Sequence, residues 1–139
     1  MRRTERELIT RIRKMAGHPG ETPGWRSVIA GIGDDCAVLR VNPGYEALVT
    51  TDFSLEGVHF RRDWSPAAAV GHRCLVRGLS DIAAMGGEPV AAFLSLALPK
   101  SVEQRWVQEF LKGLLRLARR YGVTLAGGDV AQSPRGIFG

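Results

Sequence analysis

Four aspartate-containing turns divide the chain, and each of them lies next to an apolar run. The turns occupy residues 31–35, 50–52, 79–81 and 127–129, and small residues surround each carboxylate. The apolar runs beside them predict strands or buried helices. A carboxylate at the end of a core element is costly to desolvate unless a cation balances its charge. The pattern therefore favours a fold whose core elements end near bound cations.

The composition is that of a globular protein with one domain. The 139 residues are 45% hydrophobic and 24% charged, which allows a core of normal size. No apolar stretch approaches the ~20 residues needed to cross a membrane, and the charged N-terminus lacks the apolar centre of a secretory signal. Cys36 and Cys74 lie in unlike contexts and require no disulfide. We therefore expect a reduced, cytoplasmic protein.

The net charge of +5 comes mostly from arginine. Such a balance is compatible with nucleic acid or with a phosphorylated small molecule as a partner. The basic residues are scattered, however, and no aromatic side chains interleave with them as single-strand binders require. We therefore expect no nucleic-acid partner.

The first half of the chain predicts one helix and several short strands. Thr4 and Glu7 form a capping box that opens a helix ending at Arg13 or Met15. The glycine- and proline-rich residues 17–24 predict a loop. Strands are predicted at residues 27–29, 36–41 and 46–53, and residues 55–60 extend or bend the third of them. A tight turn at 42–44 joins the second and third strands into a hairpin.

The second half alternates helices and strands. Ser65 and the proline after it open two helices or one kinked helix, which ends at residues 86–87. A buried central strand at 90–98 follows, then a helix capped by Ser101 that continues to about Tyr121, and a short strand at 123–126. The helix that Ser101 caps presents one apolar face, formed by Trp106, Phe110, Leu114, Leu117 and Ala118. This order predicts an α/β fold in which a mixed sheet with a hairpin packs against helices.

The carboxylates carry the chemistry. Taken singly, Asp35 and Asp52 are better explained as solvated turn residues, and Asp81 is equally well explained as a helix cap. In combination they favour a cluster for a hard cation such as Mg2+, and Mg2+ beside glycine turns indicates a nucleoside triphosphate. Gly128 and Asp129 are predicted at the mouth of a strand, where open sheets bind ligands.

Two further observations limit the chemistry. His59 lies between apolar neighbours, which is most often a structural position, although the nearby Gly57 and Asp52 favour a place in a ligand site. The sequence contains neither the Walker phosphate-binding motif nor a protein-kinase signature. A known nucleotide-binding loop therefore does not explain the glycine turns.

Together these motifs resemble those of thiamine-monophosphate kinase, a family in the aminoimidazole-ribonucleotide-synthetase-like superfamily. The resemblance rests on Gly-Ile-Gly-Asp-Asp-Cys-Ala at 31–37, Glu-Gly-Val-His-Phe at 56–60, Leu-Ser-Asp-Ile-Ala-Ala-Met-Gly at 79–86 and Gly-Gly-Asp at 127–129. Order and spacing agree from about residue 5 to the end. One departure is Gly78, where the family usually has asparagine, and Arg77 beside it can compensate.

The resemblance implies the phosphorylation of thiamine monophosphate to thiamine diphosphate by ATP with the help of Mg2+. It implies a set of metal ligands: Asp35, Thr50, Thr51, Asp52, Asp81 and Asp129. It also places Gly128 and Asp129 against ATP and His59 against the thiamine phosphate. The acceptor is already a phosphate monoester, so we assign no general base.

The resemblance also implies a cytoplasmic homodimer and a second α/β domain that closes over the nucleotide. Residues 132–139 are predicted to be a loop followed by the start of a strand. We therefore expect residues 1–139 to be one N-terminal ATP- and Mg2+-binding domain that stops before the second domain, with weak or no activity alone.

Two alternatives stay open. One is another ATP-dependent enzyme of the superfamily, such as selenophosphate synthetase. That family usually carries a reactive cysteine or selenocysteine near the N-terminus, and the segment before Gly31 has none. The other alternative is a nucleotide- or metal-binding module without catalysis.

Overall fold

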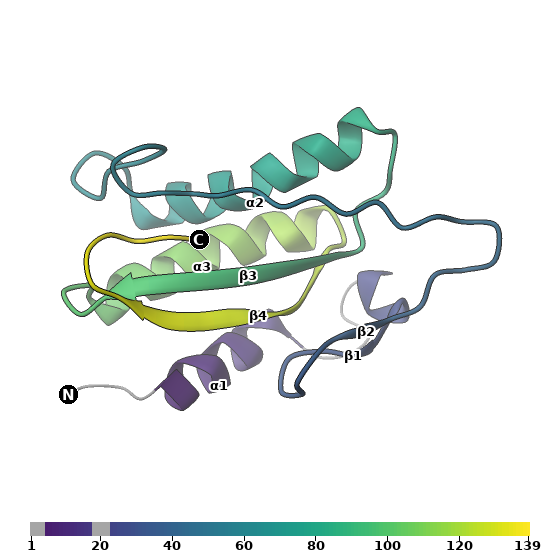
Figure 1. Cartoon of the computed structure of the whole chain (residues 1–139), viewed down its shortest axis with the longest axis horizontal. Helices are drawn as coiled ribbons and strands as arrows, with labels where there is room; N and C mark the ends of the chain where they lie inside the picture. The colour runs from purple at the N-terminus through teal and green to yellow at the C-terminus, as the bar shows by residue number, and fades with distance from the viewer. Residues whose placement is uncertain (1–4, 18–22) are drawn as a thin grey trace.

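A computed structural model describes residues 5–17 and 23–139. Its elements in chain order are α1 (Glu5–Ala16), the 3-10 helix η1 (Pro23–Arg26), β1 (Val28–Ala30), β2 (Val38–Leu39), α2 (Ala67–Ala84), β3 (Ala91–Pro99), α3 (Gln104–Arg120) and β4 (Thr124–Ser133). In Figure 1, α3 lies behind β3 and β4, with α2 on one side of it and α1 on the other. The predicted first helix is confirmed, although its Thr4 cap and residues 18–22 of the predicted loop lie outside the described residues.

Strands β3 and β4 are parallel neighbours, and the last residues of the chain extend this sheet in the antiparallel sense. Ala97 and Phe138 exchange both backbone hydrogen bonds, at 2.8 and 3.1 Å. Ser54 and Gly139 do the same at 2.5 and 3.3 Å, so residues 137–139 lie between β3 and the segment at residue 54. The predicted mixed α/β architecture is therefore confirmed.

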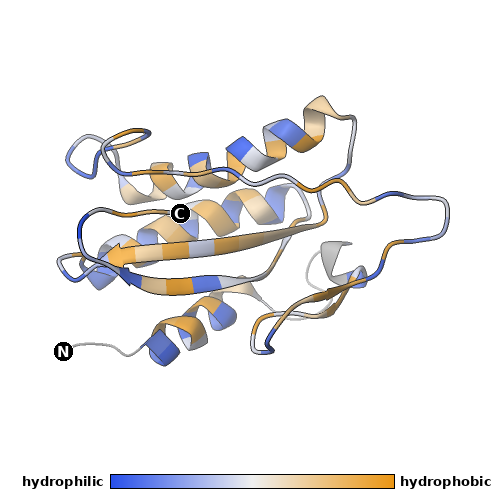
Figure 2. Ribbon diagram, viewed as in Figure 1, coloured by the Kyte–Doolittle hydropathy of each residue, from blue (hydrophilic) through white to orange (hydrophobic). Residues whose placement is uncertain are grey.

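The core forms where α3 meets the strands. The fully buried large side chains include Phe110 and Leu111 of α3, Leu96 of β3, Leu125 of β4 and Ile137. Figure 2 shows β3 as a nearly continuous apolar strand. The predicted apolar face of the second long helix is confirmed, and Trp106, at its start, stacks between Phe60 and Phe110.

Helices α2 and α3 approach each other closely through two glycines. A Cβ atom on Gly71 would overlap the carbonyl oxygen of Phe110 and lie 2.8 Å from its carbonyl carbon. A Cβ atom on Gly113 would overlap the carbonyl oxygen of Ala68 in the same way. Gly71 therefore permits helix packing and does not interrupt the helix, since α2 is one element of 18 residues.

Both helices end as predicted, each with a glycine in the left-handed conformation. Gly86 has φ of 69°, and its N–H donates to Ala83 while Gly87 N–H donates to Ile82. Gly122, with φ of 67°, ends α3 with the equivalent pair of bonds. These are Schellman motifs, in which glycine avoids the steric cost that a Cβ atom imposes at positive φ.

The predicted caps at the helix starts are wrong. Pro66 is the N-cap of α2, because Ser65 already closes a preceding turn through its N–H bond to Arg61 at 3.0 Å. Glu103 is the N-cap of α3, because Ser101 belongs to a turn closed by Val102 N–H and Pro99 O at 3.1 Å. Neither cap uses a side-chain hydrogen bond.

The predicted hairpin is also wrong. The turn at 42–44 is present, closed by Tyr45 N–H and Asn42 O at 3.1 Å, but it leads the chain away from β2. β2 pairs instead with β1, with Val28 opposite Leu39. Residues 46–53 form no strand in the described chain and run as an extended segment along α2 (Figure 1).

Two other strand predictions need correction. β3 is central, as predicted, because it has β4 along one edge and pairs with Phe138 on the other, but it is only partly buried, since Phe93 is 54% exposed. β4 is longer than predicted, and residues 127–129 lie within it and not at its mouth.

None of the helices in the described ranges, 5–17 and 23–139, has the length and apolarity required to span a bilayer.

Candidate functional site

Helix α2 and the extended segment before it bring three of the predicted ligands together. Thr50 Oγ1 donates a hydrogen bond to Asp81 Oδ2 at 2.8 Å. Asp52 lies two residues along the extended segment, so its side chain falls on the same side as that of Thr50. Asp52 Oδ1 accepts a contact from Arg77 Nη2 at 3.4 Å, and Arg77 is one helical turn before Asp81. We call Thr50, Asp52, Arg77 and Asp81 the α2 carboxylate cluster.

The cluster lies at the surface and is held by weak contacts. The side chains of Arg77 and Asp52 are 39% and 30% exposed, and their contact is long for a charged hydrogen bond. Arg77 Nε, in contrast, is buried and has no hydrogen-bond partner within residues 5–17 and 23–139. From the sequence, Arg77 is expected only to compensate for the amide that is missing at Gly78. Its four-residue spacing from Asp81 is the signal that could have placed it in the site.

The other predicted ligands do not join this cluster. Thr51 is exposed, and Asp35 is exposed in a bend between β1 and β2. Asp129 lies opposite Ser95 within the sheet and accepts a hydrogen bond from the N–H of Val130 at 2.8 Å. Over the described ranges, no three His, Cys, Asp or Glu side chains are close enough to hold a metal ion. The expectation that all these carboxylates converge in one pocket is therefore not met within this chain.

The donor set of the cluster fits Mg2+ in kind. Thr50, Asp52 and Asp81 offer one hydroxyl and two carboxylates, which are hard oxygen donors. Mg2+ is usually bound by one or two carboxylates, with water and substrate phosphates completing its coordination. Two carboxylates therefore suffice for a site that a phosphorylated ligand would complete.

Packing explains the glycines of the 127–129 motif. Gly128 has φ of 140°, and a Cβ atom there would overlap the carbonyl oxygen of Leu94 and lie 2.7 Å from its amide nitrogen. A Cβ atom on Gly127 would lie 3.1 Å from a ring atom of Phe93. Gly128 is therefore required for the close approach of β4 to β3, whether or not a ligand binds there, whereas a side chain at position 127 needs only a small shift of Phe93.

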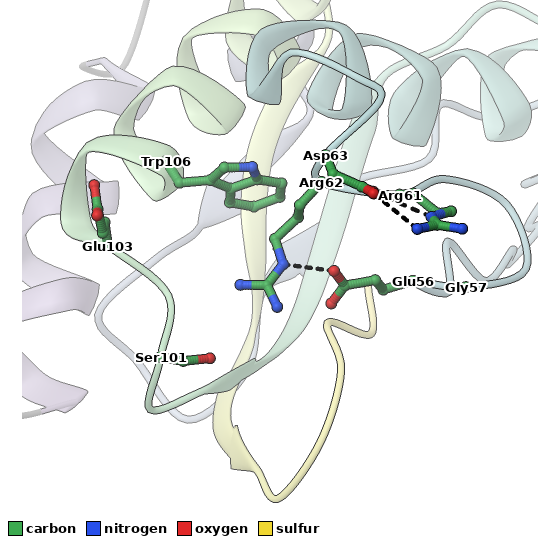
Figure 3. A pocket seen from close by; sticks show the side chains of 8 residues that line it. All are labelled: Glu56, Gly57, Arg61, Arg62, Asp63, Ser101, Glu103 and Trp106. Carbon is green, nitrogen blue, oxygen red and sulfur yellow. Dashed lines mark hydrogen bonds and ion pairs between the residues drawn. The ribbon is translucent and has the colours of Figure 1, made fainter.

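Glu56 and Gly57 of the motif at 56–60 line a hollow of about 680 Å³, which is separate from the α2 carboxylate cluster (Figure 3). The hollow is lined by Glu56, Gly57, Arg61, Arg62, Asp63, Ser101, Glu103 and Trp106. Glu56 binds Arg62 Nε at 2.5 Å through one oxygen and accepts the N–H of Ile137 at 3.0 Å through the other. The Arg61 guanidinium holds the pKa of the Asp63 carboxyl below its usual value through their hydrogen bonds. Glu56 therefore links the motif at 56–60 to residues 137–139.

His59 and the two cysteines have mainly structural surroundings. His59 is exposed, and its Nδ1 accepts the N–H of Leu55 at 2.9 Å, which fixes the turn. Both cysteines are free, as expected. Burial raises the pKa of the Cys74 thiol, and its hydrogen bond with Ser54 partly offsets this effect. Cys74 is therefore kept as a neutral thiol beside Asp52 and Arg77.

Most of the chain matches a known protein family. Residues 33–138 match the family described as AIR synthase related protein, N-terminal domain, and this range includes the whole α2 carboxylate cluster. The chain belongs to this family. The match begins at Gly33, within the first of the aspartate turns.

Curated thiamine-monophosphate kinases are similar to this chain over most of its length. The thiamine-monophosphate kinase of Synechococcus elongatus is 41% identical over 73% of this chain and 31% of its own length. That of Escherichia coli K12 is 38% identical over 75% of this chain and 31% of its own length. The chain thus spans about a third of the length of these curated relatives. The resemblance to thiamine-monophosphate kinase inferred from the motifs is confirmed.

Solved structures show the same relationship. The thiamine-monophosphate kinase of Stenotrophomonas maltophilia has 32% identity and a TM-score of 0.71, covering 94% of this chain and 39% of that one. AaThiL complexed with AMPPCP and TMP has 37% identity and a TM-score of 0.61, covering 64% of this chain and 28% of that one. Both likenesses support the family fold.

Proposed function

We propose that this chain is the N-terminal domain of a kinase that uses ATP to phosphorylate thiamine monophosphate to thiamine diphosphate. The similarity to thiamine-monophosphate kinases across three quarters of the chain supports this function. The observation that carries it is the hydrogen bond of Thr50 to Asp81 with Asp52 on the same side, which gathers hard oxygen donors on one surface. We place the reaction in the cytoplasm because it consumes ATP.

The proposed chemistry requires bringing two polyanions together, since donor and acceptor both carry phosphate. Asp52 and Asp81 would hold Mg2+, which would neutralise phosphate charge and align the reacting groups. Thr50 orients Asp81 by donating to one oxygen and leaves the other oxygen free for the ion. The remaining residues of the proposed site are Asp35, Thr51 and Asp129 as further ligands, Gly128 beside ATP and His59 beside the thiamine phosphate. The acceptor phosphate is itself nucleophilic, so no side chain is needed as a base.

The full-length protein provides the test of this function. With ATP, Mg2+ and thiamine monophosphate, we expect equal amounts of ADP and thiamine diphosphate, measured by chromatography. Turnover with another acceptor but not with thiamine monophosphate would indicate a different enzyme of the superfamily. Calorimetric binding of an ATP analogue with no turnover on any acceptor would indicate a binding module. In this proposal residues 1–139 form the N-terminal ATP- and Mg2+-binding domain, with little or no turnover by themselves.

The extended segment at residues 45–53 supports a homodimer. Tyr45, Val49 and Phe53 are 75%, 86% and 70% exposed, and their spacing of four residues places them on the same side of an extended segment, where we call them the apolar strip. Within the described ranges no backbone hydrogen bond reaches residues 46–53, so this extended segment has an unpaired backbone edge. Such an edge favours pairing with another strand, and a second copy of the chain supplies one.

We therefore expect the chain in solution at twice its monomer mass of 15.1 kDa, measured by light scattering after size-exclusion chromatography. A charge in the strip should prevent pairing, so Val49→Glu should be monomeric. Val58→Glu is the matched control, because Val58 is 74% exposed but lies outside the strip. A monomeric wild-type chain would contradict the proposed dimer.

A further inference from the structure

We propose that Arg77 is a built-in cation that competes with a divalent metal ion for Asp52 and thereby sets the metal affinity of the α2 carboxylate cluster. The inference deepens the proposed function, since it rests on the proposed metal site. The two carboxylates of the cluster have different partners: Asp81 accepts from the neutral hydroxyl of Thr50, whereas Asp52 faces the guanidinium of Arg77. Among the described residues, Asp52 is therefore the carboxylate of the cluster that has a cationic partner.

The contact has the strength expected of a displaceable pair. Its distance of 3.4 Å and the 39% and 30% exposure of the two side chains place it among solvent-screened ion pairs of modest strength. A divalent ion brings twice the charge of the guanidinium and can replace it at Asp52. Displacement needs no change in α2, because the side chain of Asp52 comes from the extended segment.

The stem of Arg77 keeps its charge within the site even when Asp52 is released. Arg77 Nε is buried and has no hydrogen-bond partner in the described chain, so the side chain is packed down to its guanidinium. Gly78, the next residue, has no side chain, and a Cβ atom there would meet only Thr50 Cγ2 at 3.8 Å. The Arg77 charge therefore stays close to the bound ion and lowers its affinity by repulsion.

The experiment is a measurement of Mn2+ binding to the chain by electron paramagnetic resonance, with Mn2+ as the probe for the hard-cation site. We expect Arg77→Gln to bind Mn2+ about tenfold more tightly than the wild type, because one repelling charge and one competitor are removed. Arg77→Met also removes the charge but keeps the apolar stem, so it should show the same gain. It serves as the second variant in case Arg77→Gln folds poorly. Arg105→Gln, an equal charge change at an exposed position of α3, should leave the dissociation constant unchanged.

The Asp52→Asn background tests the mechanism. If Arg77 acts through Asp52, adding Arg77→Gln to Asp52→Asn should yield much less than the tenfold gain. Equal or weaker Mn2+ binding in folded Arg77→Gln and Arg77→Met, with a wild type that binds, would overturn the inference and leave the proposed function standing. Absence of Mn2+ binding in the wild type and both variants would overturn the inference and the proposed metal site together.

Discussion

Gly113→Ala should unfold this domain or strongly lower its melting temperature. The added Cβ atom would overlap the carbonyl oxygen of Ala68 and lie 2.7 Å from its carbonyl carbon. Overpacking costs about 1–3 kcal/mol where side chains can move aside. Here the obstacle is the backbone of α2, so the two helices must separate. We expect a loss of at least about 3 kcal/mol, a large part of the 5–15 kcal/mol that stabilises a typical domain.

Circular dichroism during thermal or urea unfolding measures this loss, and Gly71→Ala should behave in the same way because its Cβ atom would overlap the carbonyl oxygen of Phe110. Gly78→Ala is the matched control on the same helix, where the added Cβ atom has room. It should be neutral or stabilising by up to about 1 kcal/mol, since alanine favours helix more than glycine does. A Gly113→Ala protein that melts within a few degrees of the wild type would show that the helices are less closely packed.

Asp81→Asn should reduce Mg2+-dependent turnover of the full-length protein by at least about a hundredfold. The substitution keeps the shape of the side chain and an oxygen that can accept from Thr50, but it removes the charge that would bind the ion. A metal ion contributes several kcal/mol to transition-state stabilisation, and each 1.36 kcal/mol corresponds to about tenfold in rate. Asp52→Ala and Asp129→Ala are expected to cause losses of similar size if both carboxylates hold ions.

Steady-state kinetics across a Mg2+ titration measures this effect. Asp63→Asn is the control. Asp63 is also an exposed carboxylate paired with an arginine, but it lines the hollow beside Glu56 and Trp106 and lies outside the α2 carboxylate cluster. Its turnover should stay close to that of the wild type. Turnover of Asp81→Asn within threefold of the wild type at saturating Mg2+ would rule out the α2 carboxylate cluster as the metal site.

Local rules determined much of the fold directly from the sequence. Gly86 and Gly122 end their helices as predicted, because the Schellman bonds join residues only a few positions apart. The apolar face of α3 follows from helical spacing in the same way. The Gly-Asp motifs, which also depend on order along the chain, were sufficient to indicate the family.

Tertiary structure alone decided which distant segments meet. Several strands could pair with β2, and the structure selects β1, leaving residues 46–53 along α2. The need for glycine at position 113 arises only because α2 packs against it. The contact between Asp52 and Arg77 joins residues 25 positions apart. Sequence spacing fixes neighbours within a helix or a turn, whereas contacts between elements depend on how those elements pack, and the candidate site is made of contacts of that second kind.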